Sequence, residues 1–188
     1  ALLIAVFLLK SALLPMALWL PHVYAAAAMP VAALFAILTK VGIVALLRLN
    51  ITVFGDADVV EGLLMPWLPV LALGTMGFAV VSLFAAAHLR VAAASLVLIS
   101  SGTLLFAVPF AIPPGTAALL YYLPHSTLAT GGFLMLSGLI ARRRGDLADR
   151  LVRGPCVGNR VAIGGAYALF AVAIAGLPPL SGFIGKLM

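Results

Sequence analysis

The residues best suited to chemistry in this sequence are its three lysines, because each lies within an apolar stretch. Lys10 and Lys40 lie near the middle of two such stretches, and Lys186 follows the uncharged residues 161–185. A lysine at the centre of a lipid bilayer costs about 2.5–3.5 kcal/mol by insertion scales, so such lysines are rare and usually functional. Lysines removed from water serve as proton acceptors and donors. The alternative, in which a long side chain reaches up to the headgroups, fits a helix end better than mid-span.

The acidic residues are distributed in the opposite way. All five fall in expected loops, so the expected helices contain no carboxylate. A buried cation needs a partner. We therefore expect an intramembrane Glu or Asp to be supplied from outside these residues, by a preceding part of the polypeptide or by another subunit.

A histidine and several hydroxyl groups extend this polar set. His125 follows Pro124 in an apolar stretch, and its titration range suits a proton relay. The alternative is a neutral histidine that makes one hydrogen bond between helices. Nearby hydroxyl groups could support a water wire or could simply pack helices together. The water-wire candidates are Ser11, Thr39, Ser126 and Thr130.

The composition identifies the elements that must position these residues. Of the 188 residues, 65% are hydrophobic and 9% are charged, and the mean hydropathy is +1.26. These values exclude an ordinary water-soluble enzyme, a nucleic-acid module and a disordered region. Spans of about 20 apolar residues predict membrane-crossing helices, and hence an all-α transmembrane bundle in one domain covering 1–188. The six helices are expected at about 1–20, 29–49, 63–86, 92–111, 116–141 and 162–188.

Two of these helices are expected to be broken close to a lysine. Pro15 follows Lys10, and the adjacent Pro178 and Pro179 precede Lys186. Proline interrupts the helical hydrogen-bond ladder, and membranes tolerate this only where protein or a water-filled cavity satisfies the freed backbone groups. Broken helices in corresponding places are typical of inverted-repeat transporters with ion sites near the bilayer midplane.

The loop charges indicate an orientation. Seven arginines follow the first, third and fifth expected helices, whereas Arg48 with three acidic residues lies on the other side. The positive-inside rule places the Arg-rich loops in the cytoplasm. The run Arg142–Arg144 is then a topology determinant, or alternatively a binding site for lipid or a partner. We interpret Cys156 as an ordinary loop thiol, and the sequence predicts no metal site and no cofactor. Because both ends lie in apolar runs, we interpret the chain as an internal portion of a longer polypeptide.

Several motifs resemble the antiporter-like family, which includes large membrane subunits of respiratory complex I and of the multisubunit Mrp cation/proton antiporters. They are Lys10-Ser11-Ala12 with Pro15, Leu38-Thr39-Lys40-Val41-Gly42, Tyr121-Tyr122-Leu123-Pro124-His125-Ser126, and Gly176 through Lys186. The last two resemble D-type subunits of the Mrp complex most closely. The resemblance covers nearly the whole chain and implies the seventh to twelfth of about fourteen family helices.

The resemblance also implies roles for individual residues. Lys10 matches a broken-helix lysine that pairs with a glutamate preceding Ala1, and Lys40 matches the central lysine of the next helix. His125 matches a relay histidine, and Lys186 matches the terminal lysine of the second half-channel. The implied fold is one part of an inverted-repeat antiporter. The implied setting is a multi-pass protein of the bacterial inner membrane, associated with other membrane subunits.

Two functions follow from these expectations. The leading hypothesis is a secondary transporter subunit, not an enzyme, which exchanges protons for Na⁺ or K⁺ through Lys10, Lys40, His125 and Lys186. The alternative is a proton-pumping membrane subunit of a redox complex, of the NADH:quinone oxidoreductase or membrane hydrogenase type. The sequence contains no flavin, iron–sulfur or nicotinamide motif that would favour this alternative.

Overall fold

The computed structural model describes residues 2–52, 66–110, 113–154 and 160–187, and all regular elements in these ranges are helices. Three 3-10 turns accompany eight α-helices in these ranges. The α-helices are α1 (Leu2–Lys10), α2 (Trp19–Ala26), α3 (Met29–Thr52), α5 (Trp67–Phe84), α6 (Leu89–Ala107), α7 (Pro113–Arg143), α8 (Arg160–Ala175) and α9 (Ser181–Leu187). The expected all-α bundle with two broken helices is confirmed.

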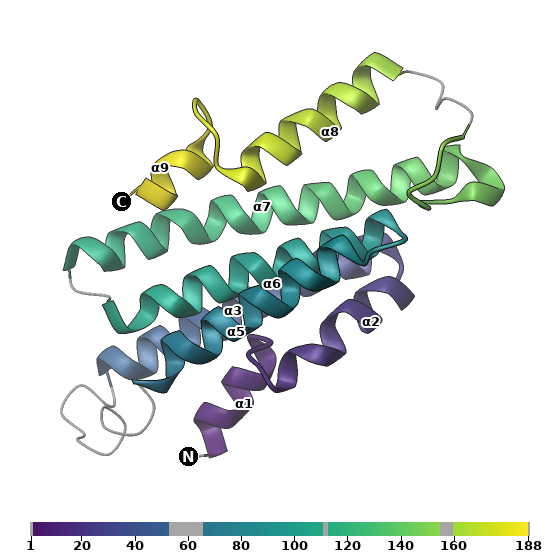
Figure 1. The fold of residues 1–188 in the computed structure, drawn as a ribbon. Coiled ribbons are helices and arrows are strands. Elements are labelled where there is room, and N and C mark those ends of the chain that lie inside the picture. Colours follow the sequence, from purple (N-terminus) through teal and green to yellow (C-terminus); the bar gives the residue numbers. More distant parts are fainter. Residues whose placement is uncertain (1, 53–65, 111–112, 155–159, 188) are drawn as a thin grey trace.

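The long helices α3, α5, α6 and α7 run side by side, and α8 with α9 follows the outer side of α7 (Figure 1). Helix α6 packs against α2, α3, α5 and α7, so it lies at the centre of the bundle. Much of its packing uses alanine and serine, small residues that let helices approach closely. Within the described residues, three helices are long and apolar enough to cross a membrane: Met29–Leu49, Trp67–Phe84 and Leu89–Phe110.

Several helices begin or end away from the expected positions. Helix α1 ends at Lys10, and α2 then continues six residues beyond the expected end at residue 20. Pro21 does not end α2 because it is the third residue of that helix, where no intrahelical donor is required. Helix α7 includes Arg142 and Arg143, because basic residues are favourable in the last turn of a helix. The expected ends at 1, 63, 111 and 188 lie outside the described residues, as do Cys156, Asp56, Asp58 and Glu61.

The first helix break is satisfied by a neighbouring helix. After α1, Ala12 adopts the left-handed conformation with φ 56°. The backbone N–H of Leu14 donates to Oγ1 of Thr75 on α5 at 3.0 Å, and Thr75 donates in turn to the carbonyl of Leu71 at 2.7 Å. Both Ala12 and Thr75 are fully buried. A side chain from α5 therefore supplies the hydrogen bond that the interrupted helix lacks.

A buried carboxylate joins three segments at the Arg-rich end of the bundle. Asp149 accepts hydrogen bonds from the backbone N–H and from Nε of Arg90, at 3.0 and 2.8 Å, and lies 3.3 Å from Nδ1 of His88. Arg90 also donates to the carbonyl of Ala25 at the end of α2. Asp149 thus caps the first turn of α6 from a distant loop. Burial works to raise the pKa of Asp149, but the hydrogen bonds and charge of Arg90, with the His88 contact, outweigh burial and lower this pKa.

We expect Asp149→Asn to lower the free energy of unfolding by about 2 kcal/mol at neutral pH, because it leaves the hydrogen-bonded Arg90 without its counterion. Asp146→Asn, at an exposed position in the same loop, is the matched control and should change stability by less than about 0.5 kcal/mol. Because folding lowers the Asp149 pKa, its contribution is complete above the ordinary aspartate range, near pH 4, and is lost as the pH falls through the lowered value. Thermal denaturation of the full-length protein in detergent at several pH values measures this. Equal loss in both variants would contradict the structural role.

Candidate functional site

Lys40 is buried in the middle of the bundle. Its side chain on α3 is 1% exposed and points to α6, where Nζ donates to Oγ of Ser100 at 2.5 Å and to Oγ of Ser101 at 3.1 Å. Both serine hydroxyls donate to the carbonyl of Val97, at 2.8 and 3.0 Å, which leaves their lone pairs available to the lysine. Two hydroxyl dipoles therefore solvate this amine in place of water.

The surroundings of Lys40 make its charge expensive. Its two hydrogen-bond partners are neutral, and in the part of the chain that the structure describes no carboxylate contacts it. A buried ammonium without a counterion is costly, and such a group persists where it serves a function. The arrangement lets the amine hold a proton on two hydroxyl acceptors, or lose it without leaving a carboxylate unpaired.

Lys10 and Ser11 lie where the first break meets α3. Lys10 ends α1 and is exposed among the described residues, whereas Ser11 is fully buried and donates to the carbonyl of Phe7 at 2.7 Å. A Cβ on Gly42 would lie 2.9 Å from Oγ of Ser11 and 3.4 Å from Cβ of Lys10. Because Gly42 is two residues beyond Lys40, the first break lies against the segment of α3 that carries the buried lysine.

The second break is built around His125 of α7. Its Nε2 lies 3.1 Å from the carbonyl of Ala173 near the end of α8, and its Nδ1 lies 2.7 Å from Oγ of Ser181 at the start of α9. In the neutral ring, Nε2–H donates to the carbonyl and Nδ1 accepts from the serine hydroxyl. In the protonated ring both nitrogens donate, and the serine oxygen becomes an acceptor. The same contacts therefore accommodate both protonation states.

Lys186 extends the same junction. From α9 its Nζ donates to the carbonyls of Ile174 and Ala175, at 3.1 and 3.0 Å. These are the last two carbonyls of α8, where the helix carries partial negative charge that favours a cation. Gly176, with φ 75°, ends α8 in a left-handed conformation that glycine adopts readily, and Pro178 and Pro179 follow before α9 begins. The structure therefore brings His125 and Lys186 to one helix end.

The four water-wire candidates are all buried, and each donates its hydroxyl to a backbone carbonyl nearby in sequence. Their oxygens keep lone pairs, but within the described residues no direct hydrogen bond links any of them to Lys40, His125 or Lys186. The candidates are Ser11, Thr39, Ser126 and Thr130.

Sequence reasoning did not pair the predicted residues with the groups that hold them. Ser100 and Ser101 stand out as two adjacent hydroxyls in an apolar helix, yet their pairing with Lys40 across 60 residues has no sequence signal. Ser181 directly precedes the glycine of the second break, but only the fold shows that it meets His125. Thr75, which satisfies the first break, is one threonine among apolar residues of α5.

Comparisons with known proteins identify the family of this chain. The family model described as NADH:quinone oxidoreductase/Mrp antiporter, TM, matches residues 1–188. The D subunit of a probable K⁺/H⁺ antiporter from Rhizobium meliloti is 39% identical, over 96% of this chain and 37% of the relative. The D subunit of a Na⁺/H⁺ antiporter from Bacillus subtilis is 33% identical, over 98% of this chain and 37% of the relative. NADH-quinone oxidoreductase N subunits also match, at 29–31% identity.

A solved structure shows the same fold. The Mrp complex from Dietzia sp. DQ12-45-1b contains a chain that superposes with a TM-score of 0.82 at 25% identity, over 98% of this chain and 34% of that one. The present chain thus spans about a third of the length of the proteins it matches. The resemblance noted from the lysine motifs is confirmed, and the protein is a multi-pass membrane protein. The chain belongs to the membrane-subunit family shared by NADH:quinone oxidoreductase and the Mrp antiporters.

Proposed function

We propose that this chain forms part of the proton path of a cation/proton antiporter, with Lys40 as its central proton carrier. The observation that carries the proposal is the Lys40 amine, 1% exposed and held by two serine hydroxyls, without a contacting carboxylate among the described residues. If Lys40 served only to stabilise the fold, an apolar residue at this buried position would cost less free energy. A proton carrier must instead be stable both as the protonated and as the neutral amine, so that it can release the proton that it binds.

The second station of the path is the junction at the end of α8. His125 can take up a proton while it keeps its hydrogen bonds to the Ala173 carbonyl and to Ser181, and Lys186 holds its ammonium against the same helix end. Protons would move between Lys40 and this junction through water, with Thr39, Ser126 and Thr130 as hydroxyl acceptors along the route. Each charged site would alter the proton affinity of the next, which couples the stations.

The first station would be Lys10 at the other break. Its exposure among the described residues fits a counterion supplied from outside residues 1–188. That counterion would be a carboxylate from a preceding part of the polypeptide or from another subunit. The names of the similar proteins, the D subunits of K⁺/H⁺ and Na⁺/H⁺ antiporters, support Na⁺ or K⁺ as the exchanged ion and other membrane subunits as partners. The bacterial sources of those proteins support the bacterial plasma membrane, and the loop charges support cytoplasmic Arg-rich loops.

The alternative function is the same proton movement driven by a redox reaction. The observation that supports this alternative is the similarity to NADH-quinone oxidoreductase N subunits, at 29–31% identity. The antiporter D subunits match at 39% and 33%. We therefore prefer cation exchange, and the driving reaction distinguishes the two functions.

We expect the double variant Ser100→Ala/Ser101→Ala to reduce the exchange rate about tenfold, because it removes both acceptors of the Lys40 ammonium. Ser95→Ala on the same helix is the control, since Ser95 bonds to Ser82 and not to Lys40. The measurement is cation-dependent dequenching of a pH-sensitive dye in everted vesicles that contain the complete complex. Unchanged exchange in the double variant, or equal loss in Ser95→Ala, would contradict the role of the serine pair.

A further inference from the structure

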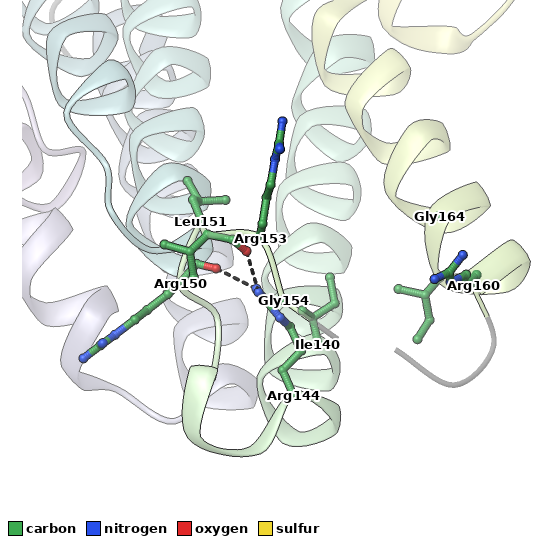
Figure 2. Close-up of a pocket in the computed structure, with 10 residues that line it drawn as sticks. Ile140, Arg144, Arg150, Leu151, Arg153, Gly154, Arg160 and Gly164 are labelled. Carbon is green, nitrogen blue, oxygen red and sulfur yellow. Dashed lines mark hydrogen bonds between the residues drawn. The ribbon is translucent and has the colours of Figure 1, made fainter. Parts of the chain in front are cut away.

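A hollow of about 620 Å³ lies between the end of α7 and the start of α8, and the proton path does not use it. Four of the ten residues drawn around it are arginines, and none is acidic (Figure 2). The arginines are Arg144, Arg150, Arg153 and Arg160. Of the two acidic residues in the adjoining loop, Asp149 is turned toward Arg90 and His88, and Asp146 does not line the hollow.

Two arginines that line the hollow differ in their contacts. Arg144 donates from Nη1 to the carbonyl of Arg150 at 2.6 Å and from Nη2 to the carbonyl of Val152 at 2.7 Å, which fixes the loop in place. The exposed side chain of Arg153 extends away from this loop (Figure 2). Arg144 therefore holds the loop, whereas the side chain of Arg153 is exposed at the hollow.

The remaining lining of the hollow is apolar and open. Ile140 of α7 and Ile163 of α8 lie on its two sides, and a Cβ on Gly164 would meet nothing within 4 Å. Leu151, Val152 and Gly154 of the loop complete the uncharged part of the lining. The hollow therefore combines an arginine rim with an apolar groove between the end of α7 and the start of α8.

We propose that this hollow binds an anionic phospholipid, with the phosphate at the arginine rim and an acyl chain in the groove beside Gly164. Guanidinium groups bind phosphate oxygens through charge-assisted and often bidentate hydrogen bonds. Arginines at the ends of apolar helices lie at headgroup level, and basic pockets between membrane helices bind lipid phosphates. A soluble phosphate would satisfy the rim alone, so the apolar groove favours a lipid. The proposal holds whether the complex exchanges cations or pumps protons.

The test is native mass spectrometry of the purified full-length protein in detergent, with added phosphatidylglycerol or phosphatidylcholine. We expect phosphatidylglycerol to bind at least about fivefold more tightly than phosphatidylcholine. Arg153→Gln should lose about fivefold of this affinity, whereas Arg143→Gln, which removes the same charge from an exposed position outside the hollow, should change it less than twofold.

A second pair of variants tests the groove without altering charge. Gly164→Leu fills the hollow and should reduce phosphatidylglycerol binding severalfold, whereas Gly165→Leu adds the same side chain outside it and should leave binding unchanged. Both glycines have open space at the Cβ position, and leucine favours helix, so both variants should fold. The proposal is overturned if both lipids bind equally, if the two members of either pair behave alike, or if inorganic phosphate displaces phosphatidylglycerol as effectively as added lipid does.

Discussion

Replacing Lys40 with methionine is expected to abolish proton exchange while the protein stays folded. Methionine fills a similar volume without an amine, so it removes the proton carrier and also the cost of a buried charge held only by Ser100 and Ser101. Groups that transfer protons typically contribute 10²–10⁴-fold to a rate, so exchange should fall at least about 100-fold. The thermal stability of the variant should equal or exceed that of the wild type.

This combination of results separates function from structure. If Lys40 only held α3 against α6, replacing it would reduce the activity and the stability of the protein together. Arg48→Met removes one positive charge from the exposed end of the same helix and should retain exchange. Substantial exchange in Lys40→Met vesicles, or equal loss in Arg48→Met, would contradict a central role for Lys40.

Gly182→Ala is expected to disable the second station by a single methyl group. The new Cβ would clash with the carbonyl oxygen of Ala173 and would lie 2.6 Å from Nε2 of His125. Both contacts are far closer than carbon permits, so α9 or the imidazole must move, and this disturbs the hydrogen bonds of His125 with Ser181 or Ala173. We expect a loss of about 1–3 kcal/mol in stability and a reduced exchange rate, because the contacts that orient His125 are disturbed.

The matched control for Gly182→Ala is Gly165→Ala on α8, where the added methyl group meets nothing within 4 Å. Because alanine favours helix over glycine, this control should keep full exchange and gain about 0.5–1 kcal/mol in stability. Vesicle exchange and thermal denaturation of the same preparations check both variants. Normal exchange in Gly182→Ala would show that the close approach of α9 to His125 is not required.

The sequence was most informative where physical chemistry makes a residue costly. A lysine among apolar residues is conspicuous in any environment, and Lys40 lies buried near the middle of α3. Glycine and proline marked the regions in which both broken helices are interrupted, since these residues act locally through φ and the missing N–H.

The partners of these residues could not be read in the same way. Thr75, Ser100 and Ser181 each meet a target 56–61 residues away, and such contacts depend on how whole helices pack. The buried role of Asp149 was also missed, because a carboxylate in an Arg-rich loop is ordinarily solvated. Helix ends shifted where prolines fell in a first turn, a position in which proline continues a helix.

The most direct test of the account uses everted vesicles that contain the complete complex with this membrane protein at full length. A pH gradient is generated by respiration, Na⁺ or K⁺ is added, and the fluorescence of a pH-sensitive dye is followed for the wild type and for Lys40→Met. We expect the cation to collapse the gradient in wild-type vesicles and to leave it intact in the variant. A collapse that persists in Lys40→Met would contradict this expectation. So would the absence of any cation response, combined with NADH-driven proton pumping that depends on Lys40, which would assign the chain to a redox-driven pump.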